Sequence, residues 1–318
     1  MDKAPEFYTL EKGILALKDE IDALAESDDI TKKDKVAEFR RAIEKEWAEI
    51  VPRLTAVHIV QIARHPKRPY TLDYIPVLFQ DFIEMHGDRR FADDPAIVAG
   101  LASYKGRTVA VIGHQKGRTT RARIERNFGQ ANPEGYRKAY RVMQEAEKFG
   151  FPVITLVDTP GAYPGIGGEE RGQAEAIAFN LKTISTLKVP IVNVVIGEGG
   201  SGGGLGIGFG DQLLMLEYSF YSVISPEGCA AILWKDQNAV DKAAENLGIR
   251  ATTLLELGII DKIIPEPPGG AHIDPEQTYK NVDKFLYQAL KKLEGKPADQ
   301  LVAERYQKIR KLGVFVEK

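Results

Sequence analysis

Two glycine-rich segments carry the residues in this sequence that are best suited to chemistry. One is "DTPGAYPGIGGEERGQ" at residues 158–173, and the other is "GEGGSGGGLGIG" at residues 197–208, which has eight glycines among twelve residues. Glycine destabilises a helix by roughly 1 kcal/mol relative to alanine, so this density indicates that backbone N–H groups are offered to a ligand. We expect more than close packing here, because packing alone does not account for eight glycines.

The chemistry that such loops can perform is the stabilisation of negative charge. N–H groups at the N-terminus of a helix bind anions, and the helix dipole adds to this effect. When these donors are directed at a carbonyl oxygen that becomes an enolate, they form an oxyanion hole. Neither loop supplies a compelling nucleophile or general base of its own, so oxyanion binding is the chemistry that we expect.

Buried strands and helices must position these loops. Each glycine-rich segment follows an apolar run typical of a strand, "PVITLVD" at 152–158 and "VPIVNVVI" at 189–196, and a helix is expected between them at about 169–187. If the two strands are adjacent and parallel, both loops lie at the same edge of the sheet. Strands that alternate with helices predict an α/β core.

Upstream and downstream segments support this organisation. The run "AIVAGLASYKGRTVAVIGH" at 96–114 predicts a hairpin with its turn at Lys105 and Gly106. Asn132 as N-cap, Pro133 at the first helical position and Gly150 after the end predict a helix over 133–149. Helical stripes recur in the tail from about residue 274.

The N-terminal segment predicts a helical hairpin of about 50 residues, with a polar break at "ESDDITKKD". We expect a hairpin extension over residues 1–60 and a main domain over 61–318 that includes C-terminal helices from about 274. The apolar stripes face either the body of the protein or another chain. Their residues are Leu10, Ile14, Leu17, Ile21 and Leu24, then Val36, Phe39, Ile43, Trp47 and Ile50.

Composition limits the class of protein. The chain has 318 residues, 43% of them apolar, and a formal net charge of -2, which gives no electrostatic reason to expect nucleic acid. Its single cysteine, Cys229, excludes a disulfide framework or a multi-cysteine zinc site within the chain. No apolar run approaches the ~18 residues that span a membrane, and no targeting segment is recognisable, so we expect a cytoplasmic protein.

Several motif matches are weaker. "GGSGG" at 199–203 fits the nucleophile elbow of serine hydrolases at Ser201, but the only later histidine is His272, and the surrounding glycines would soften the helix. "DTPG" at 158–161 is found in GTPases, yet no phosphate-binding loop accompanies it. No metal is expected, because these histidines lack ligand spacing: His58, His65, His86 and His114.

Seven blocks of sequence occur in a recognisable order: "RPYTLDYI" (68–75), "HGDRRFADD" (86–94), "GHQKGR" (113–118), "RNFGQANPEGYRKA" (126–139), "DTPGAYPGIGGEERGQAEAIA" (158–178), "GEGGSGGGL" (197–205) and "YSVISPEGCAAILWKD" (221–236). With these blocks the chain resembles the carboxyltransferase alpha subunit of the bacterial-type multisubunit acetyl-CoA carboxylase. The resemblance implies an α/β, crotonase-type fold, a spiral of ββα units with an N-terminal helical extension and C-terminal helices.

The reaction that the resemblance implies is transfer of CO2 from carboxybiotin to acetyl-CoA, which gives malonyl-CoA for fatty acid synthesis. The biotin is carried on a separate biotin carboxyl carrier protein. The implied partner is a zinc-containing carboxyltransferase beta subunit in an α2β2 heterotetramer, with biotin carboxylase in the wider complex. The metal would then belong to the partner.

The resemblance also assigns residues. The amides of Gly203 and Gly204 would form the oxyanion hole for biotin, with Gly161 and Ala162 as a second candidate pair of donors. Family members usually carry alanine at the position of Gly204. The residues implied to shape the biotin or substrate pocket are Glu198, Gly200, Ser201, Gly202 and Tyr163.

Two other classes of function stay open at this stage. A self-sufficient crotonase-like acyl-CoA enzyme would need its own acid and base, for which Glu169 and Glu170 are available, although the helix dipole explains acidic residues in a first turn equally well. A noncatalytic scaffold that only holds the beta subunit is the other. Arg118 and Arg121 are candidates for phosphate contacts or ordinary surface charges.

Overall fold

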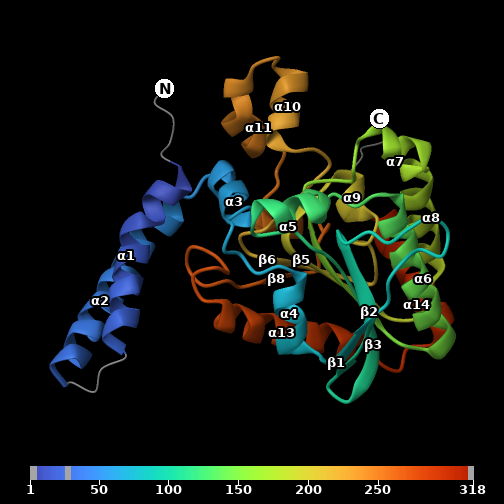
Figure 1. The fold of residues 1–318 in the computed structure, drawn as a ribbon, viewed down its shortest axis with the longest axis horizontal. Helices are drawn as coiled ribbons and strands as arrows, with labels where there is room; N and C mark the ends of the chain where they lie inside the picture. The colour runs from blue at the N-terminus through green and yellow to red at the C-terminus, as the bar shows by residue number, and fades with distance from the viewer. Residues whose placement is uncertain (1–5, 26–29, 314–318) are drawn as a thin grey trace.

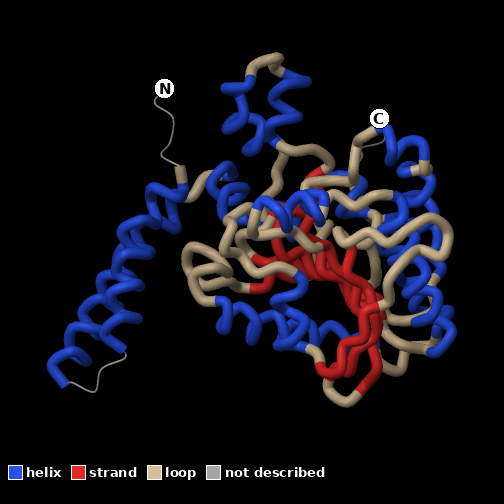
Figure 2. The backbone as a smooth tube through the Cα atoms, viewed as in Figure 1, coloured by secondary structure: helices blue, strands red, loops and turns tan. Residues whose placement is uncertain are grey.

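The core of the protein is an eight-stranded sheet with helices on both faces (Figures 1 and 2). The computed structural model describes residues 6–25 and 30–313. Its strands are β1 (Gln80–Glu84), β2 (Ile97–Tyr104), β3 (Arg107–His114), β4 (Val153–Thr159), β5 (Ile191–Gly200), β6 (Gln212–Leu216), β7 (Phe220–Ser222) and β8 (Lys262–Ile264).

Helices make up most of the rest of the described chain. The α-helices are α1 (Phe7–Ala25), α2 (Ile30–Ile50), α3 (Ala56–Ala63), α4 (Thr71–Leu78), α5 (Thr120–Glu125), α6 (Pro133–Phe149), α7 (Ile166–Glu170), α8 (Gln173–Thr186), α9 (Ser201–Leu205), α10 (Pro226–Leu233), α11 (Val240–Asn246), α12 (Ala251–Glu256), α13 (Pro275–Leu293) and α14 (Ala298–Arg310). Three short 3-10 helices are η1 (Val51–Arg53), η2 (Asn127–Gly129) and η3 (Gln237–Ala239).

The strand order is β1-β2-β3-β4-β5-β6-β8, and β7 pairs with the end of β5. The first three strands are antiparallel, and the β2–β3 pair is the predicted hairpin. From β3 to β8 every pair is parallel. The prediction that the two apolar runs are adjacent parallel strands is therefore confirmed, and the carboxyl ends of β3, β4 and β5 meet at one edge.

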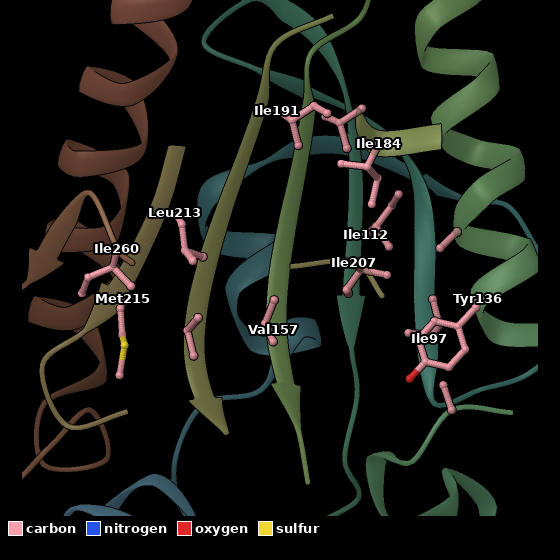
Figure 3. Close-up of a cluster of buried hydrophobic side chains, with 14 of the residues drawn as sticks. Ile97, Ile112, Tyr136, Val157, Ile184, Ile191, Ile207, Leu213, Met215 and Ile260 are labelled. Carbon is pink, nitrogen blue, oxygen red and sulfur yellow. The ribbon is translucent and has the colours of Figure 1, made fainter. Parts of the chain in front are cut away.

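Side chains on the two faces of the sheet form two separate apolar clusters. On β4, Val153 and Val157 belong to the cluster that includes α6 and α8, whereas Ile154 and Leu156 face α4 and α13. This alternation follows from the two-residue period of a strand. Figure 3 shows the first cluster, with Tyr136 of α6 among the aliphatic side chains. Because both faces are covered, only the strand ends are free to form a site.

The predicted helices are present with one correction. Helix α6 begins at Pro133 and is followed by Gly150, as predicted. The helix expected at about 169–187 is instead two helices, α7 and α8. Gly172 lies between them with φ 81°, a left-handed conformation that interrupts the helix. The expected tail helices are α13 and α14.

The N-terminal helices α1 and α2 pack against each other and project from the body (Figure 1). Their base is anchored, because Phe7, Ile14 and Trp47 are buried in a cluster that includes Tyr218 of the body. Several other stripe positions are half-buried between the two helices. Helix α3 runs across residue 60, and the division of the chain at that residue stays a prediction.

A buried polar cluster fastens α1 to the body. The carboxylate of Glu11 contacts His65 Nε2 at 3.2 Å and His272 Nε2 at 2.8 Å, and the two imidazole rings stack with their centroids 3.7 Å apart. His65 Nδ1 accepts a hydrogen bond from the Lys67 N–H, so Nε2 carries the proton that points to Glu11. These three side chains form a hydrogen-bonded clasp, and their ligand atoms also lie close enough together that they could hold a metal ion.

We expect Glu11→Gln to weaken the attachment of α1 by about 1.5–3 kcal/mol, because one imidazole N–H loses a charged acceptor. Hydrogen exchange of the α1 amides in the full chain measures this, with the exposed Glu20→Gln on the same helix as control. Equal exchange in the two variants would contradict the clasp.

Acid should release the same clasp. Burial alone raises the pKa of Glu11, but hydrogen bonds from His272 and His65 outweigh it and lower the pKa from 4.5 to about 2. Burial also lowers the pKa of His272 from its usual 6.5. Both groups bind protons more readily when the clasp is open, so its stability falls as the pH drops below about 6.5 and falls further between 4.5 and 2. Exchange of α1 amides that does not accelerate over this range would contradict the assignment.

None of the helices within residues 6–25 and 30–313 is sufficiently long and apolar to cross a membrane.

Candidate functional site

Three charged side chains lie at the carboxyl edge of the sheet, each at or just after the end of one of three neighbouring parallel strands. Lys116 comes two residues after β3, Asp158 is near the end of β4, and Glu198 is near the end of β5. The ammonium of Lys116 contacts Asp158 Oδ1 at 2.7 Å and Glu198 Oε2 at 2.5 Å. Ligands of open parallel sheets bind at this edge, and both glycine-rich loops begin here.

Lys116 stabilises the charge of each carboxylate, although all three groups are buried. Burial alone lowers the pKa of Lys116, but Asp158 and Glu198 outweigh it and hold that pKa above its usual range. Burial raises the pKa of Asp158, whereas Lys116 and Arg64 overcome burial and lower the pKa of Glu198. Nearby His114 is kept neutral, because burial and then the charge of Lys116 lower its pKa to about 3.

A second cation extends this group toward the surface. Arg64, just after α3, contacts Glu198 Oε1 at 2.6 Å through Nε and Glu227 Oε1 at 2.6 Å through a terminal nitrogen. Burial lowers the pKa of Arg64, but the two carboxylates outweigh it and raise that pKa. Glu227 lies in the first turn of α10. The ion pairs therefore run from the strand ends to the lobe formed by α10 and α11.

The two glycine-rich loops are in direct backbone contact. A Cβ atom added at Gly203 would overlap the backbone of Gly161 and Ala162, and one at Gly200 would overlap the Pro160 carbonyl. The two candidate donor pairs therefore lie next to each other.

Packing accounts for most of the glycine run, which corrects the expectation that it could not. Gly202 has ordinary space for a Cβ, and Gly204 would bring its Cβ to 3.0 Å from the Gly199 carbonyl carbon. The six other glycines would place a Cβ closer than 3.0 Å to a neighbour: Gly197, Gly199, Gly200, Gly203, Gly206 and Gly208.

Ser201 begins the short helix α9 with a φ of 50°, and its side chain is exposed. A left-handed conformation is unfavourable for a residue with a Cβ, and such strain is concentrated at functional sites. The first N–H groups of α9 point away from the helix body and have no intrahelical acceptor. Gly203 and Gly204, which follow in this short helix, are both buried.

The first loop is fixed by its own hydrogen bonds. The Gly161 N–H donates to Thr159 Oγ1 at 3.1 Å, and the Tyr163 N–H donates to the Ala131 carbonyl at 3.0 Å. The ring of Tyr163 occupies the space that a Cβ at Gly165 would need. Tyr163 thus packs on its own loop, beside Ala162.

Sequence reasoning found the loops but missed what supports them. Glu198 was expected to shape the pocket, yet both of its carboxylate oxygens are taken by Lys116 and Arg64. Lys116 lies within the block "GHQKGR", but neither the residue types nor the spacing in that block predict its contacts with Asp158 and Glu198. Arg118, a candidate for phosphate contacts, forms an ion pair with Asp73 at 2.6 Å.

The geometry agrees with a family assignment. The family described as "Acetyl co-enzyme A carboxylase carboxyltransferase-like" matches residues 7–313. The chain belongs to this family. The match includes both glycine-rich loops, the charged strand ends and the N-terminal helices.

Close relatives of this carboxyltransferase-like chain are named "Acetyl-coenzyme A carboxylase carboxyl transferase subunit alpha". The one from Geobacter metallireducens is 53% identical over 309 residues, which cover 96% of this chain and 97% of the relative. The one from Thioalkalivibrio sulfidiphilus is 50% identical over 316 residues, which cover 98% and 99%. These relatives match over nearly their whole length.

Solved structures show the fold. The Transcarboxylase 12S hexamer core with methylmalonyl-coenzyme A matches with a TM-score of 0.60 and 20% identity over 76% of this chain and 44% of that chain. A Pseudomonas malonate decarboxylase hetero-dimer matches with a TM-score of 0.55 and 18% identity over 68% and 89%. The fold of this carboxyltransferase-like chain is therefore the expected crotonase type.

The rival classes of function find little support in the site. His272 Nε2 contacts Glu11, and its Nδ1 has no hydrogen-bond partner among the described residues, so the histidine does not activate Ser201. Glu169 and Glu170, the acid and base proposed for a self-sufficient enzyme, are both exposed on α7. Neither arrangement provides a general base within the loops.

We expect Ser201→Ala to retain most of the activity, because the hydroxyl has no activating base. A fluorophosphonate probe should not label the chain at this position, and mass spectrometry of the treated protein checks it. Ser201→Gly removes the Cβ strain and is the matched control. Covalent labelling of Ser201 would contradict this prediction and favour a hydrolase.

Proposed function

We propose that this chain is the carboxyltransferase alpha subunit of an acetyl-CoA carboxylase, and that it transfers a carboxyl group to acetyl-CoA together with a beta subunit. The observation that carries the proposal is the direct contact of two glycine-rich loops at the carboxyl edge of parallel strands. The family assignment and the names of the relatives support the same reaction.

The residues present fit the biotin group of a carrier protein. The two loops meet backbone to backbone where Gly203 contacts Gly161 and Ala162, so main-chain groups of both loops lie side by side there. When bound, carboxybiotin would supply the CO2 that is transferred. In this proposal Gly203 and Gly204 donate N–H groups to the biotin oxygen, and Ala162 is the adjoining donor of the second candidate pair. The N–H of its neighbour Gly161 donates to Thr159 Oγ1 within the first loop.

The other candidate residues shape the site around these donors. In this proposal the strained turn at Ser201 and the glycines Gly200 and Gly202 set the direction of the amides, and Tyr163 borders the first loop. Glu198 supports the floor through its ion pairs. Charge that develops on an oxygen is stabilised most when such donors are fixed in advance.

Exposed apolar side chains support the part of the proposal that concerns a partner subunit. Large apolar side chains are exposed on the elements that follow the two loops and on α10, and exposed apolar patches indicate interaction sites. In this proposal they contact a zinc-containing beta subunit in an α2β2 assembly, which completes the site for acetyl-CoA. They are Ile166, Leu205, Val223, Ile232 and Leu233.

The experiment that tests this function compares the chain alone with the chain plus its beta subunit. Malonyl-CoA formation from acetyl-CoA and a carboxylated biotin carrier should require both subunits, because this chain offers one set of oxyanion donors. Robust transfer by the lone chain would contradict the shared site. No transfer by the reconstituted complex would contradict the function itself.

A further inference from the structure

The contacts of Lys116 form a closed ring of polar interactions beneath the glycine loops. Asp158 Oδ1 accepts from Lys116 Nζ at 2.7 Å and also from the Glu198 N–H at 2.9 Å. Glu198 closes the ring when its Oε2 accepts from the same ammonium at 2.5 Å. The ring thus joins the ends of β4 and β5 through both backbone and side chains.

The ring is next to the loops in sequence as well as in space. Asp158 is followed by Thr159 and Pro160 of the first loop, and Glu198 by Gly199 and Gly200 of the second. A Cβ at Gly197 would overlap the Asp158 carboxylate, so that carboxylate lies directly against the β5 backbone. Any change in the distance between Asp158 and Glu198 therefore moves the two loops relative to each other.

Stability alone gives a weak reason for such a group. The Lys116 side chain is 12% exposed, and those of Asp158 and Glu198 are 1% and 5% exposed. Buried ion pairs lose hydration on folding, and well-packed apolar residues often replace them without loss of stability. Because this buried group of charges lies at the edge of the sheet that carries the candidate site, we take its role to be to hold the strand ends in position.

We propose that Lys116 is a positioning residue for carboxyl transfer. Its ammonium fixes the spacing of the β4 and β5 ends and thereby holds the loop of Gly161 against the loop of Gly203. This inference rests on the proposed function and adds a residue that contacts neither donor pair. Without the ammonium, no side chain among the described residues bridges Asp158 and Glu198, and the two loops would lose their fixed spacing.

The test uses Lys116→Met and the charge-balanced Lys116→Met/Asp158→Asn in the complex with the beta subunit. The double variant removes one positive and one negative charge, so its thermal stability should recover relative to the single variant. Turnover should fall in both variants, by on the order of 10- to 100-fold, since small misplacements of catalytic groups have effects of this size. The KM for acetyl-CoA should change little. Full turnover in the double variant would overturn the proposal.

The matched control is Lys138→Met, which removes another buried ammonium from the same domain. Lys138 contacts Asp93 Oδ1 at 2.6 Å and the Asp94 carbonyl at 2.8 Å, away from the glycine loops. This variant should lose stability yet keep the turnover of the folded complex. A fall in turnover equal to that of Lys116→Met would show a general effect of lost stability and would overturn the proposal.

Hydrogen exchange separates this inference from the proposed function. In the full chain bound to its partner, the amides of 161–163 and 199–204 should exchange at least tenfold faster in Lys116→Met than in Lys138→Met. That readout does not depend on which carboxyl group is transferred. If the unsubstituted complex does not transfer a carboxyl group but the loop amides of Lys116→Met still exchange faster, only the proposed function is contradicted. Unchanged exchange of the amides in both loops of Lys116→Met would overturn the positioning role.

Discussion

A Gly203→Val chain should turn over on the order of 10²–10³ times more slowly than the unsubstituted chain in the reconstituted complex, the usual effect of losing one oxyanion donor. Any Cβ at this position would overlap the backbone of Gly161 and Ala162. The side chain must therefore rotate the Gly203 amide or separate the two loops. Steady-state turnover, with circular dichroism and partner binding, measures the effect.

Two substitutions control this experiment. Gly204→Ala should have a much smaller effect, because its Cβ would lie 3.0 Å from the Gly199 carbonyl carbon, a contact that needs only a small shift. Gly210→Ala introduces a comparable overlap at the opposite end of the sheet, 2.6 Å from Asn193 Oδ1, and should lower stability without slowing transfer. Normal turnover in a folded Gly203→Val complex would show that the donors lie elsewhere.

Arg305→Met should lower the free energy of unfolding by about 3–5 kcal/mol, the usual cost of removing one partner of a buried ion pair. Arg305 is 1% exposed and forms two hydrogen bonds with the Asp211 carboxylate at 2.8 and 2.9 Å. Its guanidinium also donates to three backbone carbonyls, those of Ile184, Leu187 and Val189. Its loss therefore leaves the carboxylate and three carbonyls without this donor in the interior.

The loss of stability should not change the turnover of the folded complex, because Asp211 precedes β6 and the carbonyls precede β5, at the amino edge of the sheet. Urea unfolding and turnover at low temperature check the two effects separately. The matched control is Arg310→Met, which removes an exposed guanidinium from the end of the same helix. Equal stability of the two variants would contradict the anchoring role of Arg305.

Periodicity and local signals were sufficient for the sheet and its main helices. The apolar run of β4, the caps of α6 and the turn at Lys105 are local, so a single segment of sequence specifies each of them. The adjacency of β4 and β5 required the further assumption of a parallel α/β core, and that assumption was correct. The break at Gly172 was missed, because a single glycine within a helical pattern does not by itself end a helix.

The support of the site could not be predicted, because it depends on contacts between distant residues. Glu11 and His272 are 261 positions apart, and Lys116 and Glu198 are 82 apart. No spacing rule links residues at such separations until the strand order is known. The glycine run was correctly taken as a sign that another group comes close to this backbone. Much of that close contact, however, is made by the neighbouring loop and not only by a ligand.

The contact between the two loops has a consequence for how this sequence can diverge. Because the backbones of Gly203 and Gly161 leave no room for a Cβ between them, neither loop can accept a larger residue there unless the other moves. Mutations in the two loops should therefore be strongly epistatic. A new acyl specificity should arise at exposed side chains outside the loop contact, which we call the rim, such as Val223, which is 77% exposed. A library that varies the rim and keeps both loops intact should then contain many more active members than one that varies the loops.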